Sequence, residues 1–147
     1  MARFQAMARR DDQAALLAQV PLFSACSKKE LQALAKRAEE RHVPAGTVLV
    51  REGEAGDAFY VIVSGQAEVE RSGTVVATIG PGAFFGDLAL LDKAPRNATV
   101  RAKTDMDLIV LSQPEFSAML DEAGGFARKL LVGLAHRLRE MDAQTRS

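Results

Sequence analysis

The feature that most constrains this chain is a series of short β-rich runs between Pro44 and Ser112. The runs are rich in Val, Ile, Thr and Phe, and Gly, Pro, Asn or Asp separates each from the next, which is the pattern of strands joined by tight turns. Short strands at this spacing favour an antiparallel sandwich or barrel over a parallel sheet. The expected strands are 47–51, 58–63, 66–72, 74–79, 98–102 and 108–111.

Helical patterns flank the β-rich region on both sides. The sequence predicts helices over 12–19 and 28–40, and little regular structure in the first ten residues. Ser27 and Glu30 have the spacing of a capping box, which marks the start of the second helix. Beyond the β-rich region, helices are expected over 114–121 and 126–142, with the pair Gly124 and Gly125 as a joint. The expected fold class is therefore α+β, mainly β.

The last predicted helix carries an apolar stripe whose members alternate spacings of four and three, as in the seam of a coiled coil. Such a stripe can pair with a second copy of the chain, or it can pack on the β-rich region, and the pattern alone does not decide between the two. The stripe consists of Ala127, Leu131, Leu134, Leu138 and Met141.

Residues 84–100, which read FFGDLALLDKAPRNATV, have the features of an anion-binding cradle. Gly86 allows a ligand to approach the main chain closely, and 87–91 predicts one helical turn whose free N–H groups face an anion. Arg96 can bind two phosphate oxygens at once. Asp87 is unsuited to phosphate but can accept hydrogen bonds from a sugar hydroxyl, which makes a ribose phosphate the simplest ligand. Alternatively, Asp87 is the N-cap of the helical turn.

Composition narrows the class of protein. The 147 residues carry 19 basic and 19 acidic side chains, so a formal net charge of zero supplies no general attraction to nucleic acid or to an anionic membrane. No apolar run has the length of a signal-peptide core or a membrane span. We expect one soluble, cytoplasmic domain over 1–147.

The candidate chemistry is binding rather than catalysis. The single cysteine, Cys26, excludes an intramolecular disulfide. His42 and His136 share no metal-ligand spacing with each other or with Cys26, and neither lies in a predicted strand. The sequence predicts no metal site, no cofactor and no catalytic residues, which argues against an enzyme, including a cupin-type β-barrel enzyme with ligands on facing strands.

The motifs resemble those of the cyclic nucleotide-binding domain family, which includes protein kinase A regulatory subunits, cyclic-nucleotide-gated channels and bacterial cyclic-AMP receptor-type transcription factors. The resemblance rests on FGDLAL at 85–90, on PRNATV at 95–100 and on the run 51–65, and it covers most of 20–142. It implies a jelly-roll-like antiparallel β-roll over 44–112. A phosphate-binding cassette over 84–100 would interrupt the roll between its sixth and seventh strands, with N-terminal helices over 1–43 and a C-terminal hinge and lid helix over 114–142.

The resemblance also implies roles for single residues. Arg96 would pair with the cyclic phosphate together with the backbone N–H groups of Ala89 and Asn97, and Asp87 would accept from the ribose 2′-hydroxyl. The family usually has glutamate at the position of Asp87, and loss of that charged hydrogen bond would weaken binding about ten- to a hundredfold. The predicted ligand-binding residues are Gly86, Asp87, Leu88, Ala89, Arg96, Asn97 and Ala98.

The function that the resemblance implies is a regulatory sensor of cyclic AMP or cyclic GMP. Asn97 matches neither the alanine of many cyclic-AMP binders nor the threonine of many cyclic-GMP binders, and we favour cyclic AMP. Leu90 and a phenylalanine near the hinge, Phe116 or Phe126, would move on binding. The last helix would then close, with Leu131, Leu134 and Leu138 as a possible lid over the base.

The expected partners follow from the same resemblance. Cyclic-AMP receptor-type proteins dimerise through the corresponding helix, which favours a homodimer with an unidentified protein effector. No helix-turn-helix follows the last helix, so we expect no DNA binding. The alternative is a ligand-independent β-roll that serves interaction or dimerisation and has a decayed pocket.

Overall fold

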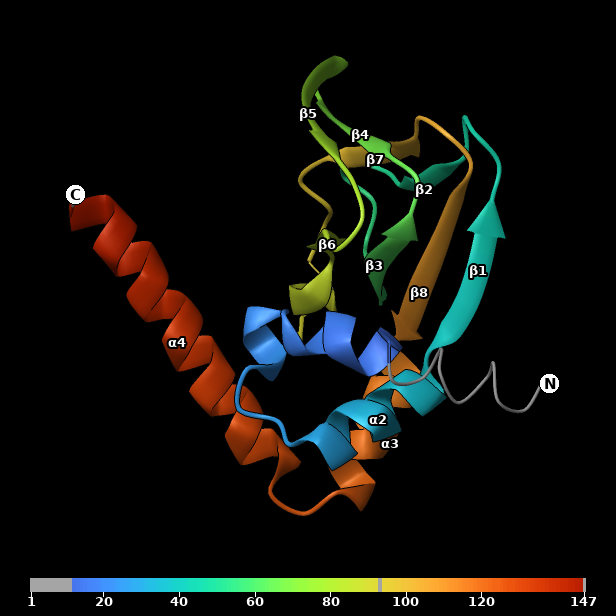
Figure 1. Cartoon of the computed structure of the whole chain (residues 1–147). Coiled ribbons are helices and arrows are strands. Elements are labelled where there is room, and N and C mark those ends of the chain that lie inside the picture. Colours follow the sequence, from blue (N-terminus) through green and yellow to red (C-terminus); the bar gives the residue numbers. More distant parts are fainter. Residues whose placement is uncertain (1–11, 93, 147) are drawn as a thin grey trace, which may run out of the picture. The chain divides into compact units, whose positions relative to one another are not determined.

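The computed structural model describes residues 12–92 and 94–146, with side chains as far as 142 (Figure 1). The expectation for the first ten residues lies outside this range. The described chain divides into two compact units, which we treat separately: the β-rich unit of residues 38–114 and the helical unit of residues up to 37 together with those from 115 onward.

The β-rich unit forms two antiparallel sheets, which confirms the expected β-roll. Within 38–114, Lys93 excepted, one four-stranded sheet has the order β1-β8-β3-β6 and the other the order β2-β7-β4-β5. The strands are β1 (Glu39–Val43), β2 (Val48–Val50), β3 (Ala58–Ser64), β4 (Ala67–Arg71), β5 (Thr74–Ile79), β6 (Phe84–Phe85), β7 (Thr99–Ala102) and β8 (Met106–Ser112).

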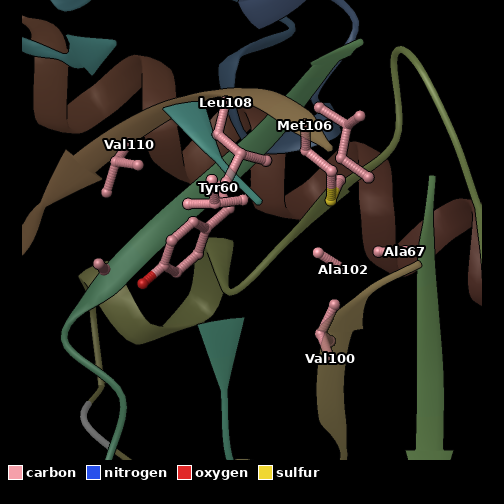
Figure 2. Packing of buried hydrophobic residues seen from close by; sticks show 10 residues of the cluster. Tyr60, Ala67, Val100, Ala102, Met106, Leu108 and Val110 are labelled. Atoms are coloured by element: carbon pink, nitrogen blue, oxygen red, sulfur yellow. The ribbon is translucent and has the colours of Figure 1, made fainter. Parts of the chain in front are cut away.

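Both sheets contribute to one hydrophobic cluster (Figure 2). Ile62 of β3 and Leu108 of β8 come from the first sheet, and Val100 and Ala102 of β7 come from the second; all are almost completely buried. Val100 and Ala102 are two positions apart in β7. Because alternate side chains of a strand point to the same face of its sheet, both face this cluster. This shared core holds the turns between the strands, including the predicted cassette, in place.

Two strands were missed from the sequence. The helix expected to reach residue 40 ends earlier, since α2 spans Lys28–Arg37 and β1 begins at Glu39. Four of the five β1 residues are exposed and only Val43 is buried, so β1 shows no apolar alternation. The expectation that neither histidine lies in a strand is therefore wrong: His42 is in β1, with Nδ1 at 2.8 Å from Asp107 Oδ1. The other missed strand, β6, has only two residues.

The helical unit contains the expected helices. A helix covers 12–18, and η1 (Pro21–Phe23), α2, α3 (Gln113–Glu122) and α4 (Phe126–Arg146) follow; α3 begins at the end of the β-rich unit. The capping box is confirmed: the Ser27 N–H donates to Glu30 Oε1 at 2.9 Å, and the Glu30 N–H donates to Ser27 Oγ at 3.2 Å. No helix among the described residues combines the length and apolarity that a membrane crossing requires.

The buried side of α4 differs from the predicted stripe. Phe126, Leu130 and Gly133 are buried, whereas Leu131 and Leu138 of the stripe are 66% and 65% exposed. Gly133 allows α4 and η1 to approach closely on this side, because a Cβ on it would lie 2.2 Å from the carbonyl oxygen of Leu22 in η1. The two main chains thus come close on the packed face of α4, while Leu131 and Leu138 of the stripe remain exposed.

Candidate ligand-binding site

The predicted cradle begins with a turn that only glycine adopts easily. Gly86 follows β6 with φ 83° and ψ 14°, and it is the N-cap of the short 3-10 helix η2 (Asp87–Leu90). Glycine adopts this left-handed backbone without a steric clash because it has no Cβ. Because Gly86 holds the N-cap position, the alternative expectation that Asp87 is the N-cap is wrong; Asp87 is the first residue of the turn.

The side chain of Arg96 lies against this turn. Its Nη2 donates to the carbonyl oxygen of Ala58, at the start of β3, at 2.6 Å. Its Nε is buried and has no hydrogen-bond partner among the described residues. The guanidinium passes between Gly86 and Gly56, close to the main chain of both. The structure therefore brings together two of the predicted site residues, Gly86 and Arg96.

The backbone of Arg96 is fixed as well. The Arg96 N–H donates to the Glu54 carbonyl at 2.8 Å, and the Arg96 carbonyl accepts from the Gly53 N–H at 2.7 Å. Next to these bonds, Ala55 and Pro95 form an isolated antiparallel bridge. The upstream run that carried part of the family resemblance and the arginine of the cassette thus form one structural element.

The remaining predicted residues differ in exposure. Asp87, Ala89 and Ala98 are buried, at 5%, 7% and 7% exposed. Leu88 is 45% exposed, and Asn97 is exposed. Asp87 carries a carboxyl group, which is costly to bury unless it has partners, and it has at least one interaction within the structure.

The backbone N–H of Ala89, predicted to meet a phosphate, already has a partner. It donates to the carbonyl oxygen of Gly86 at 3.1 Å within η2. A phosphate at this point would have to share or replace that bond. The predicted role of this N–H stays a prediction.

The residues predicted to move on binding are largely buried. Leu90 is 2% exposed. Phe116 and Phe126 are fully buried in the helical unit, where their rings meet edge to face with centroids 5.8 Å apart. Leu134 is half-buried between the exposed stripe residues Leu131 and Leu138. The lid role of these three leucines stays a prediction.

Sequence reasoning missed Gly56, which lies beside the guanidinium of Arg96. A glycine in a loop before a strand is usually a turn residue, and Gly56 gave no other signal in the sequence. Its contact with Arg96 joins residues 40 positions apart and becomes visible only in the fold. Within the described part of the chain, no three His, Cys, Asp or Glu side chains come together where they could hold a metal ion.

Comparison with known proteins identifies the family to which the fold belongs. The model of the cyclic nucleotide-binding domain family matches residues 40–123. The cAMP-dependent protein kinase regulatory subunit of Yarrowia lipolytica is 42% identical over 114 residues, which is 76% of this chain and 30% of that relative. The chain therefore spans less than a third of that relative's length.

Two solved structures support the same assignment. The N-terminal domain of a transcriptional regulator from Streptomyces coelicolor A3(2) superposes with a TM-score of 0.80 at 30% identity, covering 87% of this chain and 95% of that one. The regulatory domain of Toxoplasma gondii PKA, solved with cAMP, has a TM-score of 0.69 at 35% identity, covering 76% of this chain and 44% of that one. Together with the β-roll and the position of Arg96 beside Gly86, these similarities show that the chain belongs to the cyclic nucleotide-binding domain family.

Proposed function

We propose that this chain is a sensor domain that binds a cyclic mononucleotide, with cyclic AMP preferred, and that Arg96 holds the cyclic phosphate. The observation that carries the proposal is the guanidinium of Arg96, which is held at Ala58 while its buried Nε has no partner among the described residues. A buried unpaired donor costs about 1–3 kcal/mol. An anion that accepts from Nε offsets this cost, and the planar guanidinium suits a phosphate with two oxygens in reach.

The choice of cyclic AMP rests on relatives. The Yarrowia lipolytica relative is named as a regulatory subunit of a cAMP-dependent kinase, and the Toxoplasma gondii structure contains cAMP. Asn97, which would lie nearest the base-selecting position of the family pattern, has an exposed side chain. Its amide can hydrogen-bond either purine, so the relatives and not this residue favour adenine.

We extend the proposal to the sugar through Asp87. Its side chain is buried beside the left-handed turn at Gly86, and a carboxylate there can accept from a ribose hydroxyl. The residue has other interactions in the structure, so the sugar contact would add to its existing ones. Replacing Asp87 by asparagine keeps the size and removes the charge, and we expect about a tenfold loss of affinity.

The finer part of the proposal is a relay through α4. The joint between α3 and α4 contains Gly125, which has φ 81° and where an added Cβ would meet no atom within 4 Å, so we take this joint as the hinge of the relay. Leu131 and Leu138 are exposed and available for a new contact, either with the ligand or with a second copy of the chain. A ligand shifts such a helix only by its differential affinity for the two positions, typically about 1–3 kcal/mol.

The predicted dimer interface on α4 has its own test. Light scattering with and without cyclic AMP, on the wild type and on a Leu131→Gln, Leu138→Gln variant, reports the mass of the particle. A ligand-dependent or constant dimer that the variant loses supports the predicted interface. A monomer under all conditions contradicts dimerisation through this stripe and leaves nucleotide binding untouched.

Isothermal titration with cyclic AMP and cyclic GMP tests the binding itself. We expect saturable binding with cyclic AMP tighter than cyclic GMP. Arg96→Ala should lose at least about a hundredfold in affinity, and Arg96→Lys less, because lysine keeps the charge and loses the fork. Arg71→Lys is the matched control, since Arg71 is exposed at the end of β4, and it should bind as the wild type does.

The alternative function predicts a different result. A ligand-independent interaction domain would be folded by circular dichroism and would show no heat and no rise in melting temperature with either nucleotide. That outcome would reject the sensor proposal. Binding that survives Arg96→Ala unchanged would reject the assigned role of Arg96.

A further inference from the structure

The strongest unassigned feature of the β-roll is the space that Gly56 leaves empty. A Cβ on Gly56 would lie 2.1 Å from Nε, 2.4 Å from Cζ and 2.7 Å from Nη2 of Arg96. Real Cβ atoms essentially never approach other heavy atoms within 3.0 Å. The guanidinium therefore occupies the volume in which the side chain of any other residue at position 56 would begin.

A second glycine bounds the guanidinium from the cassette side. A Cβ on Gly86 would lie 2.3 Å from Nη1 of Arg96 and 2.7 Å from the carbonyl oxygen of Ala58, which accepts from Nη2. The guanidinium is thus bounded by Gly56 before β3, by Gly86 before η2 and by the Ala58 carbonyl. We call this arrangement of Gly56, Gly86 and Ala58 the guanidinium seat.

The two glycines are needed for different reasons. Gly86 has φ 83°, so its backbone alone favours glycine. Gly56 does not have a positive φ, so its φ does not exclude a residue with a Cβ. The reason for glycine at position 56 that the structure gives is the guanidinium of Arg96.

We propose that Gly56 is a positioning residue for nucleotide binding: its missing side chain sets where the phosphate-binding fork of Arg96 lies. This inference rests on the proposed function, because it assigns to Gly56 the orientation of the residue that would hold the phosphate. Gly56 itself acts only through Arg96. The hydrogen bonds that tie Arg96 N and O to Glu54 and Gly53 hold the Arg96 backbone, so we expect the guanidinium, and not that backbone, to move when a Cβ is added at position 56.

Gly56→Ala should therefore separate affinity from stability. The atoms that it meets belong to the far end of a flexible side chain, which can turn away at little cost to folding. This rotation of the Arg96 side chain removes the guanidinium from its seat. Bidentate recognition of an anion depends on the orientation of the guanidinium. We expect the dissociation constant for cyclic AMP to rise at least about tenfold, with a melting temperature close to that of the wild type.

Two comparisons distinguish positioning from a general structural effect. Gly80→Ala introduces the same methyl group in the same unit, at a glycine without positive φ whose nearest atom, Gly65 O, would be 3.9 Å away, and it should bind as the wild type does. In an Arg96→Lys background, Gly56→Ala should cause little further loss, because the branched guanidinium that it displaces is absent. Such non-additivity is the sign of two residues that act through one contact.

The outcomes are separable. If the wild type binds and Gly56→Ala binds equally well, the positioning role is rejected and the proposed function stands. If Gly56→Ala does not fold, the double variant with Arg96→Lys decides: it folds if the methyl group conflicts with the guanidinium, and failure to fold rejects the seat as the cause.

If the wild type binds neither nucleotide, the proposed function fails and the seat is tested without ligand. Heteronuclear NMR detects the buried Nε–H of Arg96, identified by its absence in Arg96→Lys. We expect slow exchange with solvent in the wild type and fast exchange in Gly56→Ala. An unchanged exchange rate in Gly56→Ala contradicts the inference.

Discussion

Gly56 in the β-roll and Gly133 in α4 both leave no room for a side chain, but they differ in what fills the space. Beside Gly56 the nearest atoms are those of the Arg96 guanidinium, whereas beside Gly133 they are main-chain atoms of Leu22 and Pro21 in η1. A guanidinium can turn away, and a main chain held in a packed unit cannot do so cheaply. The same lack of space therefore constrains the position of one side chain in the β-roll and the packing of two main chains in the helical unit.

Gly86→Ala should have the largest effect, because Gly86 combines both situations. Its φ of 83° is unfavourable for alanine, and the added Cβ would meet the main-chain oxygen of Ala58 at 2.7 Å as well as the Arg96 side chain. Left-handed backbone and overpacking together cost about 2–5 kcal/mol. We expect a fall in unfolding free energy of this size in urea, together with loss of nucleotide binding.

Gly82→Ala is the control for Gly86→Ala. Gly82 also has a positive φ, of 87°, but it has no atom within 4 Å of the added Cβ, so it reports the backbone cost alone. Equal losses of stability in the two variants would show that the contacts around Gly86 do not matter.

Gly133→Ala comes next and isolates the main-chain conflict. Alanine favours a helix over glycine by about 1 kcal/mol, whereas overpacking costs about 1–3 kcal/mol. Because the added Cβ would lie 2.2 Å from Leu22 O, we expect the conflict to dominate, with a net destabilisation of up to about 2 kcal/mol by urea unfolding. A more stable variant would show that α4 does not approach η1 this closely, and Gly133 would then mark no main-chain contact.

The two regions also differ in how well the sequence predicted them. In the roll, the strand 74–79 was predicted with its observed ends, because turn residues border it on both sides. In α4 the helix was expected but its buried side was not. The leucine stripe had the stronger pattern, yet the buried residues are Phe126, Leu130 and Gly133, and Gly133 contributes by the absence of a side chain.

The same limit applies to the site. Arg96 and Gly86 could be predicted, because each belongs to a recognisable local motif within the cassette. Gly56 could not, because its partner is distant in sequence and its backbone has no unusual conformation. Strand β1 was missed since its charged, exposed residues belong to an edge strand that pairs only with β8. The features that could not be predicted depend on contacts between segments that are far apart along the chain.

Ser27→Ala tests whether the helical unit depends on local hydrogen bonds as well as on close packing. It removes the side-chain acceptor for the Glu30 N–H at the start of α2. Loss of such a cap costs about 1 kcal/mol, which chemical denaturation can detect. Lys28→Ala, at an exposed position in the first turn of the same helix, is the control and should change stability much less. A Ser27→Ala variant as stable as this control would argue against the capping box.

The smallest expected effect concerns acidification. Burial, the largest single influence, raises the pKa of Glu30, but hydrogen bonds from Lys129 and Ser27 together outweigh it and hold the pKa below the ordinary value of 4.5. A carboxyl group whose pKa is lower in the folded state stabilises the fold above its unfolded-state pKa. That contribution is lost as the pH falls through the lower, folded-state pKa.

Lys129→Met removes the contact of Lys129 Nζ with Glu30 Oε1 that joins α4 to α2. Because Lys129 is 39% exposed and solvent screens the pair, we expect a loss of at most about 1 kcal/mol near neutral pH. The difference from the wild type should narrow as the pH falls below about 4.5 and through the lower folded-state pKa, at which Glu30 of the folded wild type becomes protonated. Urea titrations at several pH values, with exposed Lys36→Met in α2 as the control, measure this. A difference that stays constant down to acidic pH would mean that Lys129 stabilises the helical unit through the packing of its alkyl chain and not through its charge.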